Sequence, residues 1–253
     1  MNKLCRITEN EIISEFLKAE FYQPEYDRDR GQFETVVYEP NLGDINENAI
    51  RRALLFRRRG HMWRELPTDT QWWEVEFRPD EAEKVNVFPR AQWRAPAQGN
   101  FAALHVAERI RKDMLSPNPS PLSVKIQALA ALLQHDGPKS TVMLIGLDEH
   151  RPVTLLEGNH RFIASLMLPR ELMLNRLRIV CGFSPNIEKC CWYKTNLPTL
   201  SHYLKNRIKY FWDREADVYR VLSQIQLEGG NTRVRGEFGA PAERPAVKTK
   251  QAS

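Results

Sequence analysis

Hydrophobic and polar positions follow their clearest pattern between residues 122 and 183. Leucine, isoleucine and alanine recur at helical spacing in 122–135, and the two apolar, β-branched runs that follow are typical of buried strands. After the turn at Gly158, apolar residues again recur at helical spacing. The predicted elements here are a helix over 122–135, strands over 141–147 and 152–158, a helix over 161–168 and a strand over 176–183.

The first half of the chain has weaker periodicity, interrupted by turn-forming residues. The predicted elements are helices over 9–22, 47–58 and 101–114, strands over 34–38, 70–78 and 84–89, and a loop over 90–101. Three prolines in alternate positions prevent a helix within residues 116–121. One or two further helices are expected in residues 199–227.

This order of elements predicts an α/β fold of the α+β type, with a small mixed sheet and flanking helices. At 253 residues the chain is long enough for one large domain with additions. We expect a mostly helical extension over 1–70, the core over 71–198, C-terminal helices over 199–228 and a basic tail over 229–253. The composition of the tail, rich in Gly, Pro, Arg and Lys, predicts disorder.

Composition excludes several classes of protein. The apolar fraction of 42% and the charged fraction of 27% are ordinary for a globular protein. No run of about 18 apolar residues is present and the N-terminus lacks the apolar segment of a secretory signal, so we expect a cytoplasmic protein without a membrane span. The four cysteines lack the spacing of a zinc site or a disulfide framework, which favours reduced thiols.

The positive net charge gives a mild preference for anionic partners. The formal charge is +5, and arginines cluster within residues 51–59 and again near the C-terminus. A DNA-binding domain usually carries a stronger and more continuous basic stripe. We therefore interpret the cluster at 51–59 as a solvated basic helix end rather than a nucleic-acid patch.

Residues 157–161, here called the EGNHR segment, join a predicted strand to a predicted helix. The first turn of a helix has unpaired N–H groups and a partial positive charge, and Gly158 lets the backbone approach an anion closely. Arg161 has the forked guanidinium that binds two phosphate oxygens, and His160 can donate to phosphate or exchange a proton. Asn159 is expected to cap the helix, and Glu157 to hold Mg²⁺ or orient a hydroxyl.

The same five residues also fit a plain turn followed by surface residues of a first helical turn. Their position decides between the two interpretations. They lie between a buried strand and an amphipathic helix, and such junctions are where ligands bind in α/β folds. We therefore predict an anion-binding site for a phosphate group or nucleotide.

The segment and its surroundings resemble the ParB/sulfiredoxin superfamily. Members carry an acidic residue or glycine, a glycine, any residue, a histidine or arginine, and an arginine, ahead of an apolar helix with small residues. Here the EGNHR segment is followed by Ile163, Ala164 and Ser165, and the elements on either side have the matching order. The resemblance spans about residues 72–183, and residues 122–183 contain the features on which it rests.

The resemblance implies a ParB/sulfiredoxin-like core that handles a nucleotide. In this superfamily the loop holds phosphates of ATP or CTP, or the DNA backbone, and one branch of small-molecule kinases begins its loop with an acidic residue, as Glu157 does here. The sulfiredoxin branch has a catalytic cysteine where Asn159 stands, which disfavours sulfinic acid reduction. The chromosome-partitioning branch carries a helix-turn-helix after the core, and residues 199–227 lack a clear recognition pair of helices.

Phosphoryl transfer requires groups beyond the EGNHR segment, because Mg²⁺ must offset phosphate charge and a carboxylate must position the attacking hydroxyl. Glu74 and Glu76 share one face of a predicted strand, and for each residue taken singly the solvated face of that strand is the better interpretation. Arg90 and Arg94 are candidate phosphate contacts. Tryptophans at 72, 73 and 93 are interpreted as core rather than as a platform for a base.

Three hypotheses follow. The first is a nucleotide-dependent phosphotransferase or ATP-hydrolysing enzyme, which would use ATP or another nucleotide with Mg²⁺ and a small hydroxyl-bearing metabolite. Its candidate catalytic residues are Glu157, His160 and Glu76, its candidate metal ligand is Glu157, and its candidate phosphate ligands are Gly158, Asn159, His160, Arg161 and Arg94. The second is a DNA-binding or nuclease protein, and the third is a nucleotide-sensing module without catalysis.

Overall fold

A computed structural model describes residues 1–89, 91–135, 137–210, 212 and 216–234. The chain divides into two compact units. The larger unit comprises Met1–Phe16 and Arg59–Asp213, and the smaller unit comprises Leu17–Arg58 and Arg214–Ser253. Each unit is described by itself. In the described part of the chain, no helix combines the length and hydropathy that crossing a membrane requires.

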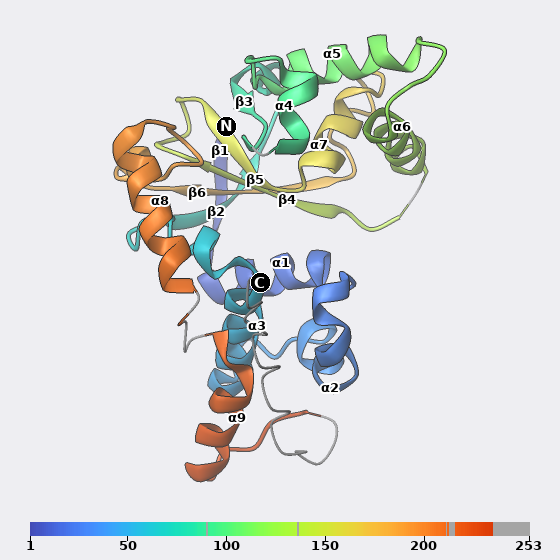
Figure 1. The fold of residues 1–253 in the computed structure, drawn as a ribbon. Helices are drawn as coiled ribbons and strands as arrows, with labels where there is room; N and C mark the ends of the chain where they lie inside the picture. Colours follow the sequence, from blue (N-terminus) through green and yellow to red (C-terminus); the bar gives the residue numbers. More distant parts are fainter. Residues whose placement is uncertain (90, 136, 211, 213–215, 235–253) are drawn as a thin grey trace, which may run out of the picture. The chain divides into compact units, whose positions relative to one another are not determined.

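A six-stranded mixed sheet forms the centre of the larger unit (Figure 1). Its strands lie in the order β1-β2-β6-β4-β5-β3, with β4 parallel to β6 and β3 parallel to β5. The strands are β1 (Asn2–Ile7), β2 (Gln71–Glu76), β3 (Val85–Asn86), β4 (Ser140–Gly146), β5 (Val153–Glu157) and β6 (Leu177–Phe183). The prediction of a mixed sheet flanked by helices is therefore confirmed.

Helices cover one face of this sheet and bury its main core (Figure 1). They are α4 (Ala91–Ala97), α5 (Ala103–Met114), α6 (Pro121–Leu133) and α7 (Asn159–Leu166). Alternate residues of the central strands, such as Val142, Leu144 and Ile179, pack into the core under these helices. The unit also contains α8 (Leu197–Tyr210) and the short helices η2 (Pro79–Lys84) and η3 (Ile187–Lys189).

Polar residues on the opposite face of the sheet hold the first half of α1 (Glu9–Glu20). Arg178 of β6 donates from Nε to Glu74 and from Nη2 to Glu11, at 2.8 and 2.7 Å. The Thr141 hydroxyl donates to Glu15 at 2.7 Å. Arg178 and Thr141 of the sheet are thus bonded to α1, and Glu74 is bonded to Arg178.

The smaller unit contains η1 (Pro24–Tyr26), α2 (Asp27–Tyr38), α3 (Ile45–Trp63) as far as Arg58, and α9 (Val218–Leu227). Arg51 is fully buried and donates to the Val36 and Asn41 carbonyl oxygens, both at 2.9 Å, and to Glu47 at 3.2 Å. Glu47 in turn accepts from Arg233 Nε at 2.6 Å.

The interpretation of residues 51–59 as a solvated basic helix end is therefore wrong for Arg51, which completes a buried ion pair. Two further arginines of the cluster also contact acidic groups: Arg57 pairs with Asp29, and Arg58 lies 3.2 Å from Glu20. Guanidinium groups bonded inside the unit do not form a continuous basic stripe for nucleic acid.

Most predicted elements are present, with boundaries shifted by a few residues. The predicted strand over 34–38 is wrong, because these residues end α2, and Phe33, Val36 and Val37 are buried at helical spacing. The predicted loop over 90–101 is also wrong, since it contains α4, which includes Pro96. The predicted strand over 84–89 shortens to β3, and β1 was not predicted. Of the predicted tail, residues 235–253 lie outside the described residues.

Candidate anion-binding site

Gly158 forms the junction between β5 and α7. Its φ of +84° lies in the left-handed region, which favours glycine. A Cβ at this position would lie 2.9 Å from Val142 Cγ2 and 3.2 Å from Val142 Cα. Both the backbone conformation and the contact with β4 therefore require glycine, and the predicted glycine turn between strand and helix is present.

Asn159 does not cap α7, contrary to the prediction. The N-cap of α7 is Gly158, which has no side-chain cap. Asn159 is 9% exposed, and its Oδ1 accepts the backbone N–H of Phe88 at 2.8 Å. The side chain thus holds the segment after β3 against the first turn of α7.

His160 packs on Trp93, with ring centroids 5.2 Å apart. Burial, followed by the positive charges of Lys125 and Arg161, lowers the pKa of His160 to about 4. The imidazole is therefore neutral at pH 7. It supplies no positive charge to an anion, and a pKa so far below neutrality makes it a weak general base.

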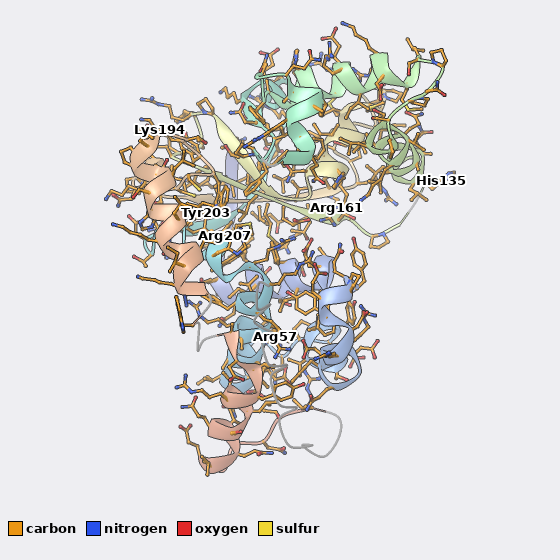
Figure 2. All side chains as sticks on the ribbon, in the orientation of Figure 1. Arg57, His135, Arg161, Lys194, Tyr203 and Arg207 are labelled. Carbon is orange, nitrogen blue, oxygen red and sulfur yellow. The ribbon has the colours of Figure 1, made fainter. Side chains whose placement is uncertain are left out.

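Arg161 and Glu157 face each other at the start of α7, where Figure 2 labels Arg161. Arg161 Nη2 lies 3.5 Å from Glu157 Oε1, and the two side chains are 24% and 20% exposed. The charged groups predicted for phosphate and for Mg²⁺ thus form a loose ion pair that is partly open to solvent.

The structure does not bring Glu76 to the EGNHR segment. In the sheet, Glu74 is level with Val180, Val180 with Met143, and Met143 with Glu157. Three strand spacings separate Glu74 from Glu157, or about 14 Å. Glu76 lies two residues further along β2, where it accepts a hydrogen bond from Asn2 Nδ2 at 2.9 Å.

No group of three or more His, Cys, Asp or Glu side chains among the described residues is arranged to hold a metal ion. Glu157 would therefore act as a single carboxylate ligand. Magnesium bound by one or two carboxylates takes its remaining ligands from water and substrate phosphates. A metal at Glu157 would thus depend on a bound nucleotide.

A cavity of about 610 Å³ lies in the larger unit, beside the segment that Asn159 holds. Among the described residues, its lining contains three arginines, one histidine and two aromatic rings that bear polar groups, and no carboxylate. The lining residues are Arg59, His61, Pro89, Gln92, Arg94, Cys191, Trp192, Thr195, Leu200, Tyr203 and Arg207. Of the predicted phosphate ligands, Arg94 is in this wall, exposed to solvent. Arg90 lies outside the described residues.

Aromatic rings form one side of this cationic cavity. Tyr203 packs edge-on against Trp192 at 4.8 Å between centroids, and His61 lies 6.1 Å from Tyr203. Arg207 Nη1 donates to the Tyr203 hydroxyl oxygen at 3.0 Å, and Figure 2 shows both side chains on α8. Trp192 Nε1 is buried and has no hydrogen-bond partner in the described part of the chain.

Two contacts connect the first turn of α7 to this cavity. Phe88, whose N–H binds Asn159, packs its ring on Trp192 at 4.7 Å, and the next residue, Pro89, lines the cavity. Trp93, which contacts His160, precedes Arg94 in the cavity wall. The EGNHR segment therefore contacts residues next to the cavity wall, although none of its own residues is in the lining.

Of the lining residues, Arg94 alone was predicted as a site residue. The other charged and aromatic residues of the lining were not predicted to belong to a site: Arg59, His61, Trp192, Tyr203 and Arg207. One signal was available, because Tyr203 and Arg207 are four residues apart in a predicted helix and so share a face. The others come from separate elements that only the fold brings together.

The comparisons with known proteins add no further assignment. No protein-family model, curated protein or solved structure matches this chain. The resemblance to the ParB/sulfiredoxin superfamily thus rests on the EGNHR segment and the order of elements around it, and it stays a prediction.

Proposed function

We propose that this protein binds a nucleotide in the cationic cavity. The phosphates would lie against Arg94 and Arg207, and the base against the aromatic side formed by Trp192 and Tyr203. The observation that carries the proposal is a cavity of about 610 Å³ whose lining, in the part of the chain that the structure describes, combines three arginines with aromatic rings and contains no carboxylate.

The chemistry of this lining suits a phosphorylated, partly aromatic ligand. Guanidinium groups bind phosphate oxygens through paired, charge-assisted hydrogen bonds. Aromatic rings provide a surface for a base. Small-molecule pockets occupy about 300–1,000 Å³, so the volume suits a ligand of nucleotide size.

Phosphotransfer to a small hydroxyl-bearing metabolite, with ATP and Mg²⁺, extends this proposal. Magnesium would offset phosphate charge, and Glu157 is the carboxylate at α7 that could hold it or orient the hydroxyl. This extension requires the terminal phosphate to come close to the first turn of α7. Because His160 is neutral, we do not assign proton transfer to it. Its ring would instead hold Trp93, and with it the neighbouring Arg94, in place.

The other two hypotheses make different demands on the structure. A nucleotide-sensing module needs the same cavity and no working carboxylate. A DNA-binding function loses its main support, because Arg51, Arg57 and Arg58 are bonded to groups of the smaller unit.

Titration calorimetry with MgATP tests the binding proposal. Arg94→Ala and Arg207→Ala should each raise the Kd about tenfold or more, since a charge-assisted hydrogen bond contributes roughly 1.5–3 kcal/mol. Lys205→Ala removes an exposed positive charge from the same helix outside the cavity lining and should leave the Kd within about twofold. Absence of MgATP binding, or equal Kd values for all three variants, would refute the proposal.

Release of ADP tests the phosphotransfer extension separately. Glu157→Gln should bind MgATP nearly as well as the unchanged protein and lose turnover in the presence of a metabolite mixture. Normal turnover by this variant would remove Glu157 from the mechanism and leave nucleotide binding in place. Strong, steeply salt-dependent retention of DNA in a gel would favour the DNA-binding hypothesis instead.

A further inference from the structure

A second cavity, of about 700 Å³, lies elsewhere in the larger unit and is absent from the function proposed above. Its wall is built by the turn after α3, the segment around η3 and the start of α8. The lining residues are Arg64, Glu65, Leu66, Pro67, Thr68, Pro185, Asn186, Glu188, Lys189, Lys194, Asn196, Pro198, Thr199 and His202. Unlike the cationic cavity, this one contains carboxylates as well as cations.

Glu65 is the distinctive residue of this wall, because it is only 3% exposed. One carboxylate oxygen, Oε1, accepts from Asn206 Nδ2 at 2.7 Å. The other, Oε2, is buried and meets no N–H or O–H donor among the described residues. Burial, followed by the charge of Glu65 and a hydrogen bond to its carboxylate, raises the pKa of the Cys191 thiol, so among the described residues a weak thiol donor is the group that this carboxylate meets besides Asn206.

A buried carboxylate oxygen without a strong donor is costly, since it loses water without replacement. A donor that enters the cavity would supply the missing hydrogen bond. The terminal torsion of a glutamate side chain is soft, so the Glu65 carboxylate could reorient to meet such a donor. An ammonium group is the best complement, because it brings a positive charge and several donors to an ionised acceptor.

The opposite charge is also available in the same lining. Lys189 Nζ donates to the neutral amide oxygen of Asn186 at 2.8 Å. Its charge also acts on the Asp69 carboxylate, whose pKa is lowered by hydrogen bonds from Ser184 and Asn186 and, to a smaller extent, by Lys189. No carboxylate among the described residues lies within ion-pair distance of Lys189 Nζ, so an acidic group of a ligand would bind it directly. Lys194, labelled near the start of α8 in Figure 2, pairs instead with Glu188 at 2.9 Å. The cavity thus presents a buried acceptor at Glu65 and a cation at Lys189.

We propose that this second cavity binds a small amphoteric ligand, with an ammonium group at Glu65 and an acidic group at Lys189. The proposal goes beyond nucleotide binding and does not depend on it, because the two cavities share no lining residue. The apolar portion of the ligand would contact Leu66 and the prolines of the wall.

Matched probes test this proposal on the full chain. Binding of 4-aminobutyrate and 5-aminopentanoate is measured by calorimetry and by ligand-detected NMR, each beside the carboxylate of equal length that lacks the amine. The amino compounds should bind at least tenfold more tightly than butyrate and pentanoate. Glu65→Gln should abolish this difference, because the amide no longer offers a charged acceptor.

A second variant keeps the test decisive if Glu65→Gln fails to fold, as judged by circular dichroism. Lys189→Ala should raise the Kd of the amino compounds several-fold. Lys205 is an exposed residue of α8 outside both linings, so Lys205→Ala should leave these Kd values unchanged. The proposal is overturned if neither amino compound binds at millimolar concentration, or if amine-bearing and amine-free probes bind equally. It is also overturned if a folded Glu65→Gln retains the preference for the amine.

Discussion

Replacing Gly158 by alanine tests how the end of β5 is joined to the first turn of α7. The substitution adds one methyl group at a position with φ of +84°. That methyl would lie 2.9 Å from Val142 Cγ2 and 3.2 Å from Val142 Cα, and real Cβ atoms essentially never approach within 3.0 Å. Rotation of the valine side chain can relieve only the first contact, and the contact with the Val142 backbone at 3.2 Å stays tight.

The expected loss of stability has two parts. Left-handed backbone costs a residue with a Cβ about 1–2 kcal/mol, and overpacking a core contact costs about 1–3 kcal/mol. Restriction of the unfolded chain returns roughly 0.4–1 kcal/mol. Gly158→Ala should therefore lower the free energy of unfolding by about 2–4 kcal/mol.

Gly99 provides the matched control. Its φ is +91°, and a Cβ there meets nothing within 4 Å, so Gly99→Ala incurs the conformational cost alone, about 1 kcal/mol. Urea unfolding followed by circular dichroism and tryptophan fluorescence measures both variants. Adding Val142→Ala should reduce the cost of Gly158→Ala, because one colliding atom is gone. Equal losses for Gly158→Ala and Gly99→Ala would refute the role given to the β4 contact.

Three further predictions concern stability and the cavity wall. The pKa of His160 is lowered from 6.5 to about 4, so the folded protein should lose stability as pH falls from about 6.5 towards 4. The free energy of unfolding should fall by roughly 1–2 kcal/mol, a value discounted for the partial exposure of the ring. Urea unfolding at pH 7 and at pH 4.5 should show this loss in the unchanged protein, and His160→Gln should lack this contribution. Glu47→Gln leaves the buried Arg51 guanidinium without its carboxylate and should lower the free energy of unfolding by about 3–5 kcal/mol. The exposed Glu108→Gln should cause a far smaller loss, and similar losses for the two variants would contradict the buried ion pair. Asn159→Ala leaves the backbone N–H of Phe88 without its acceptor and should raise the Kd for MgATP, measured by calorimetry. An unchanged Kd would show that the contact between α7 and the cavity wall does not affect binding.

The centre of the sheet could be predicted from the sequence because β4 and β6 are buried on both faces. Residues 141–147 and 176–183 form apolar runs that only a buried strand or helix explains, and their lengths favour strands. β1 was missed for the opposite reason: five of its six residues are exposed, so no apolar alternation marks this edge strand. The TVVY run at 35–38 misled because β-branched residues favour strands, whereas here Val36 and Val37 pack in a helical core.

The candidate site was predicted only in part. The glycine turn at 158 and the exposed Arg94 follow from local rules about turns and loops. The cavity itself was not predictable, because α8 and the loop at Trp192 meet the Arg94 segment only through tertiary packing. The hydrogen-bond partners of side chains are likewise not predictable from the sequence. The Asn159 side chain, for example, accepts a hydrogen bond from the Phe88 backbone instead of capping α7.

A crystal structure of the protein with MgADP bound tests the central proposal most directly. We expect phosphate oxygens within hydrogen-bond distance of the Arg94 and Arg207 guanidinium groups, and the base beside Trp192 and Tyr203. Nucleotide density at another place on the larger unit, with the cationic cavity unchanged and filled only by solvent, would contradict the proposal.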